Sequence, residues 1–208
     1  MAPLKLPENE QRTVLVKRGL LLNYTTLGYN AIEAVVSIIA GVMAGSIALL
    51  GFGLDSVVET VSSVAAQWRL RMDVHAARRA HVEQLAHRII GISFLALAAY
   101  VSYDSVKTLW QRQIPERSLL GIAILTLSVV VMPWLARKKR TVARMLASKA
   151  LESDAKQTSL CAYLSVIALA GVALNATLGW WWADPVAALL MVPIIAIEGV
   201  EGVRSMEG

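Results

Sequence analysis

The chain has 208 residues, of which 56% are hydrophobic and only 17% are Asp, Glu, Lys or Arg. A soluble domain carries about 25% charged residues, so this composition, with a mean hydropathy of +0.56, excludes an ordinary soluble protein and indicates an integral membrane protein. The single cysteine, Cys161, excludes an intrachain disulfide. The net charge of +5 is compatible with nucleic-acid binding, and the positions of the basic residues decide whether that function is expected.

Six apolar runs separated by polar segments predict six membrane-spanning helices, and hence an all-α integral membrane fold. We expect the helices at 19–42, 45–70, 88–110, 117–136, 147–174 and 184–204. Residues 1–18 form a polar and basic N-terminal segment with no signal-peptide cleavage pattern, so the first apolar run is a retained helix. Residues 19–204 form the membrane domain, and we expect no soluble C-terminal domain after it.

Basic residues set the orientation of these helices. Most Lys and Arg residues lie at the chain ends and in two connections, "RLRMDVHAARRAHVEQLAHR" and "RKKRTVARM", whereas "AGVMAGS" and "NATLGWWWAD" contain none. Because basic connections stay cytoplasmic, we expect a multi-pass protein of the cell (inner) membrane with both termini in the cytoplasm. Their place beside membrane helices predicts contact with anionic lipid and argues against nucleic acid as a partner.

The first predicted helix contains one buried acid, Glu33. It lies at about the same depth in the membrane as Asp55 of the second predicted helix. A carboxyl group at this depth is costly and therefore points to function. Three roles stay open for Glu33: metal ligand, proton carrier and helix-packing group.

The second predicted helix carries an acidic pair, Asp55 and Glu59, within "LLGFGLDSVVETVSSVAAQW". Residues four apart lie on one face of a helix. Each acid costs roughly 2.5–3.5 kcal/mol at the centre of a membrane helix, and repulsion at about 5 Å adds roughly 3 kcal/mol at an effective dielectric of about 20. A bound cation or a proton would remove most of this cost, and a fixed partner such as Lys156 is the structural alternative.

Three histidines, His75, His81 and His87, occupy the connection between the second and third predicted helices. Their spacing of six residues does not place them on one helical face. We interpret them as solvated loop residues rather than as a second metal site.

The fifth predicted helix contains Gln157 and Cys161, which are four apart and share a face. Cys161 lies close to the depth of Glu59. A lone buried cysteine is usually a small apolar filler, but one that faces two carboxylates is a plausible soft metal ligand. In the sixth helix, Asp184 followed by Pro185 is typical of a helix start.

The order of "GSIALLGFGLDSVVE", "HVEQLAHRIIG", "SDAKQTSLCAYLS" and "WWADPVAALLM" resembles the cation diffusion facilitators, and more closely their subgroup without a cytoplasmic metal-binding domain. The resemblance covers residues 18–204. It implies that Asp55 and Glu59 match the family's acidic pair. It places Gln157 and Cys161 where the family has a His or Asp followed by an Asp, so the chain departs from the pattern at both positions and Glu33 could supply a replacement ligand.

The resemblance implies a homodimer that exchanges cytoplasmic divalent metal for protons. Carboxylate and thiolate ligands suit Zn²⁺, or Cd²⁺, better than Mg²⁺ or Ca²⁺, so we expect Zn²⁺ as transported substrate and no tightly bound cofactor. We do not expect an enzyme, because Cys161 has no membrane-embedded histidine beside it to activate it. The alternative function is a non-transporting membrane scaffold or metal-sensing subunit that retains an ion site.

Overall fold

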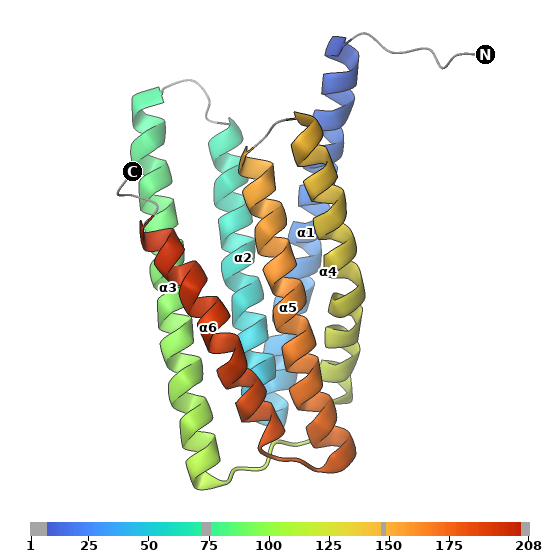
Figure 1. The fold of residues 1–208 in the computed structure, drawn as a ribbon, viewed down its shortest axis with the longest axis vertical. Coiled ribbons are helices and arrows are strands. Elements are labelled where there is room, and N and C mark those ends of the chain that lie inside the picture. The colour runs from blue at the N-terminus through green and yellow to red at the C-terminus, as the bar shows by residue number, and fades with distance from the viewer. Residues whose placement is uncertain (1–7, 72–75, 147–148, 205–208) are drawn as a thin grey trace, which may run out of the picture.

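The computed structural model describes residues 8–71, 76–146 and 149–204, and within them it consists of six long helices and the short connections between them. Figure 1 shows the helices running side by side along the long axis of the molecule. The six helices are α1 (Glu8–Ala44), α2 (Ile47–Arg71), α3 (Ala76–Gln111), α4 (Leu119–Leu146), α5 (Lys149–Leu178) and α6 (Ala183–Arg204). The predicted all-α fold is confirmed.

Several helices are longer than the sequence predicted. α1 begins at Glu8 rather than at residue 19, α3 begins at Ala76 rather than at residue 88, and α4 continues to Leu146. Most of the two basic segments predicted as loops is therefore helical. Hydropathy marks only the apolar part of a helix, whereas Ala, Arg, Lys and Gln continue it at little cost in free energy.

The longer α3 also corrects the prediction that the histidines lie in a loop. The backbone positions of His81 and His87 lie on the first turns of α3 rather than in a loop, while His75 lies outside the described residues. Their spacing along α3 still does not place them on one face.

Within the residues whose side chains are described, α1, α3, α4, α5 and α6 each contain a stretch long and apolar enough to cross a membrane. α2 carries the two acidic residues, and it packs against α1, α3, α5 and α6, which places it at the centre of the bundle. Large apolar side chains such as Met43, Val61 and Val130 are exposed on the outside of the bundle. The two acidic residues of α2 therefore lie inside a bundle whose outer surface is apolar, as is typical of a multi-pass membrane protein.

Hydrogen bonds join the three short connections at one end of the bundle, which we call the tied end. The Asp184 carboxylate accepts hydrogen bonds from Ser46 Oγ at 2.5 Å and from the Ile47 backbone N–H at 2.9 Å. Asn175 Nδ2 donates to the Pro115 carbonyl at 2.9 Å. Asp184 lies in the first turn of α6, as expected of a residue at a helix start, but its carboxylate caps the start of α2.

Between the tied end and Asp55, apolar side chains fill the bundle. Leu49, Phe52, Val101 and Leu125 are fully buried, and they belong to α2, α3 and α4. This apolar layer separates the acidic residues of α2 from the tied end.

We predict that Gly91→Ala destabilises the protein, because α3 and α6 approach each other too closely for a side chain there. A Cβ atom at Gly91 would lie 2.8 Å from the Gly199 carbonyl oxygen and 2.8 Å from the Val203 backbone nitrogen. Such overpacking costs about 1–3 kcal/mol, measurable as a lower midpoint of thermal unfolding in detergent. Gly28→Ala is the control, since a Cβ there meets nothing within 4 Å; equal midpoints for the two variants would contradict the packing.

Candidate metal site

The two acids of α2 open into a small cavity. Asp55 is 6% exposed and Glu59 is 3% exposed, and one oxygen of Glu59, Oε2, is buried without a hydrogen-bond partner in the described structure. The cavity has a volume of about 20 Å³, which is room for one small ion or water molecule. Its lining residues come from α2, α3, α5 and α6: Asp55, Glu59, Phe94, Gln157, Leu160, Cys161, Leu164, Ile194, Ile195 and Glu198.

Both candidates on α5 line the same cavity. Gln157 is half-buried and Cys161 is 1% exposed. The i, i+4 pairs on α2 and α5 therefore face one another across this space, as their shared depth in the sequence suggested.

Glu33 lies on the other side of Cys161 and is absent from the residues that line the cavity. It is fully buried, and its carboxylate accepts hydrogen bonds from Ser56 Oγ at 2.9 Å and from Ser128 Oγ. The Cys161 thiol lies 3.6 Å from Glu33 Oε2. Protein hydroxyl groups thus already satisfy both oxygens of Glu33, and the thiol stands between this carboxylate and the cavity.

The donor atoms do not yet form a coordination shell. Among the side chains that the structure describes, which exclude those of residues 65–87, no three His, Cys, Asp or Glu side chains converge closely enough to hold a metal ion. A bound metal would therefore have to draw the carboxylates of α2 toward the donors of α5. The cavity between them makes such a movement sterically possible.

Lys156, the fixed partner considered for the acidic pair, points elsewhere. Its ammonium lies 2.9 Å from Glu201 and 4.0 Å from Glu198, both on α6, and its side chain is 59% exposed. Lys156 therefore links α5 to α6 at the surface. It does not neutralise the acids of α2.

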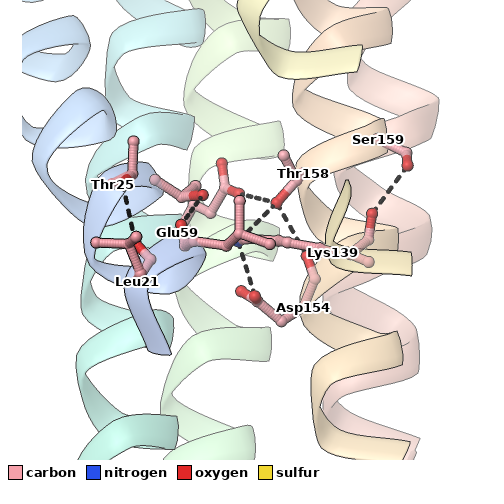
Figure 2. Close-up of polar contacts among 10 residues, drawn as sticks. Leu21, Thr25, Glu59, Lys139, Asp154, Thr158 and Ser159 are labelled. Atoms are coloured by element: carbon pink, nitrogen blue, oxygen red, sulfur yellow. Dashed lines mark hydrogen bonds and ion pairs between the residues drawn. The ribbon is translucent and has the colours of Figure 1, made fainter. Parts of the chain in front are cut away.

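A different lysine is buried near the acidic pair. Lys139 of α4 has 0% of its side chain exposed, and its ammonium lies 2.7 Å from Asp154 and 3.1 Å from Thr158 Oγ1. Thr158 Oγ1 lies 3.5 Å from Glu59 Oε1. Figure 2 shows Lys139 between Asp154 and Thr158, with Thr158 next to Glu59.

Glu198 and Lys139 were not identified from the sequence as residues near the site. Glu198 could have been identified, because a charged residue inside the apolar span of α6 points to a functional site. Lys139 is part of the run "RKKR", in which the sequence alone assigns every residue to a cytoplasmic cluster of basic residues. Only the helical phase of an extended α4 separates the buried lysine from its exposed neighbours.

Comparison with known proteins agrees with this arrangement. The sequence profile described as "Cation efflux transmembrane domain" matches residues 25–206. The chain belongs to the cation diffusion facilitator family. The match covers the described parts of all six helices except the start of α1 and so includes every candidate residue above.

Three curated relatives are similar to this cation diffusion facilitator. Transmembrane protein 163 of Xenopus laevis is 28% identical over 66% of the chain and 49% of its own length. An uncharacterized transporter of Synechocystis is 27% identical over 80% of the chain and 56% of its own length. Another, of Methanocaldococcus jannaschii, is 23% identical over 80% of the chain and 61% of its own length. The chain thus spans roughly half the length of the relatives it matches.

We predict that Ser128→Ala lowers the free energy of unfolding by about 1–3 kcal/mol, because it leaves a buried carboxylate oxygen of Glu33 without its donor. The measurement is chemical or thermal unfolding of the detergent-purified variant. Ser93→Ala is the control, since the Ser93 hydroxyl bonds only to the Ile89 carbonyl of its own helix, at 2.8 Å, near the surface. A Ser128 variant as stable as the Ser93 variant would contradict this role.

Proposed function

We propose that this protein exports a divalent metal ion, Zn²⁺ or Cd²⁺, from the cytoplasm in exchange for protons. The observation that carries the proposal is the acidic pair, Asp55 and Glu59, which lines a cavity with a thiol deep in the membrane domain. In the described part of the chain, neither acid forms an ion pair with a basic side chain within 4 Å. Buried carboxylates without a fixed counter-ion favour a mobile cation.

The ligand chemistry supports the choice of metal. We propose Asp55, Glu59 and Cys161 as the ligands, with Gln157 as a neutral oxygen donor beside them. A mixed oxygen and sulfur shell suits Zn²⁺ and Cd²⁺, whereas Mg²⁺ and Ca²⁺ take oxygen ligands. Glu33 fits better as a residue that positions the Cys161 thiol, because two serine hydroxyls occupy its oxygens and it lies behind the thiol.

The arrangement of the bundle supports a loading direction. The apolar layer around Leu49 and Phe52 lies between the acids and the tied end, so metal reaches the site from the opposite end. We propose that this opposite end, where the basic residues gather, faces the cytoplasm. Because the ligands must lose protons to bind metal, binding at this side releases protons, and protonation from the other side returns the empty site. The homodimer implied by the family resemblance stays a prediction.

We expect Asp55→Ala to abolish Zn²⁺ flux in proteoliposomes, because it removes one of the two carboxylates that neutralise the ion. The measurement is uptake of Zn²⁺ reported by a dye inside the vesicles, with a pH gradient imposed. Asp104→Ala is the control, since Asp104 of α3 is half-exposed and does not line the cavity.

Normal Zn²⁺ flux in the Asp55 variant would refute the site. Zinc binding by the wild-type protein without any flux would instead favour the alternative function, a metal-sensing or scaffold subunit that keeps an ion site.

A further inference from the structure

Lys139 is a fully buried cation whose place in the fold needs an explanation. Its two sequence neighbours, Lys138 and Arg140, are exposed on the same turn of α4. A lysine close to the end of a membrane helix can normally extend its ammonium to the polar surface. Lys139 instead points between α4 and α5, where 0% of its side chain is exposed.

The ion pair with Asp154 compensates this burial but does not account for its direction. The ammonium lies 2.7 Å from Asp154, whose side chain is 13% exposed and which lies on the second turn of α5. On its other side, the ammonium donates to Thr158 Oγ1 at 3.1 Å, and the same hydroxyl oxygen lies 3.5 Å from Glu59. The positive charge is therefore within two hydrogen-bond lengths of a carboxylate of the acidic pair (Figure 2).

We propose that Lys139 is a tethered competitor of the transported cation: it supplies positive charge beside Glu59 when the site is empty, and Asp154 must hold it back for metal to bind. This inference rests on the proposed function, because it concerns the same site. It assigns opposite effects to the two members of one ion pair. Lys139 weakens metal binding, and Asp154 strengthens it by keeping the ammonium away from Glu59.

The physical basis is the low dielectric of the bundle. A positive charge a few ångströms from the acids repels a divalent cation far more strongly there than in water. The same ammonium also lowers the cost of leaving Glu59 buried without metal, so it stabilises the empty transporter on its return. A short step of the ammonium from Asp154 toward Glu59 would exchange the two states, and Thr158 lies on that path.

The test is the equilibrium dissociation constant for Zn²⁺ of the purified full chain, measured by competition with a chelating dye. Lys139→Met should bind Zn²⁺ at least about tenfold more tightly than the wild type, because the competing charge is gone. Lys139→Gln is a second neutral variant with the same expected sign. Asp154→Asn should bind at least about tenfold more weakly, because the released ammonium pairs with Glu59.

The double variant, Lys139→Met with Asp154→Asn, should regain the affinity that Asp154→Asn loses. Lys138→Met is the matched control: it removes the same charge one residue away from an exposed position, and its affinity should equal that of the wild type. Lys139→Arg keeps the charge and should not bind more tightly.

A purely structural role for the ion pair gives a different pattern. If Lys139→Met and Asp154→Asn both weaken binding, or if neither neutral variant of Lys139 tightens it, the inference is overturned while the proposed function stands. If the wild-type protein itself binds no Zn²⁺, the proposed function fails and the inference fails with it. The wild-type measurement therefore separates the two failures.

Discussion

The structure depends on how buried negative charge is balanced in the middle of the bundle. Asp55 and Glu59 lie on the central helix, and the described residues contain one fully buried basic side chain near them, Lys139, already paired with Asp154. Carboxylates placed in this way are stabilised by protons or by a cation from outside the chain. The cavity beside them is the place in which such a cation fits.

The three membrane-buried acids near the site differ in how many of their carboxylate oxygens the protein hydrogen-bonds. Glu33 is bonded by two serine hydroxyls from α2 and α4, so the protein itself satisfies it. Glu59 keeps one buried oxygen without a partner in the described structure, and Asp55 faces the cavity. A satisfied carboxylate holds helices together, whereas an unsatisfied one beside a cavity is ready to bind a ligand. The tied end and the apolar layer fix one end of α2.

Much of this was predictable, and the limits have physical causes. Six helices follow from apolar runs, and the i, i+4 spacing places Asp55 with Glu59, and Gln157 with Cys161, on one face of their own helices. That both faces line one cavity comes from the structure. Helix ends were missed because good helix formers continue a helix beyond its apolar part. The burial of Lys139 and the contacts of Ser128 with Glu33 depend on the rotation of α4 against α1 and α5, which no local pattern of the sequence encodes.

The most direct test of the central claim is X-ray absorption at the zinc edge of the Zn²⁺-loaded, purified protein. With a single cysteine in the chain, the account predicts one sulfur neighbour at about 2.3 Å and oxygen neighbours at about 2.0–2.2 Å. Asp55→Ala should lose this signal. A shell of imidazole nitrogens without sulfur would place the metal at the histidines near the start of α3 and would contradict the account.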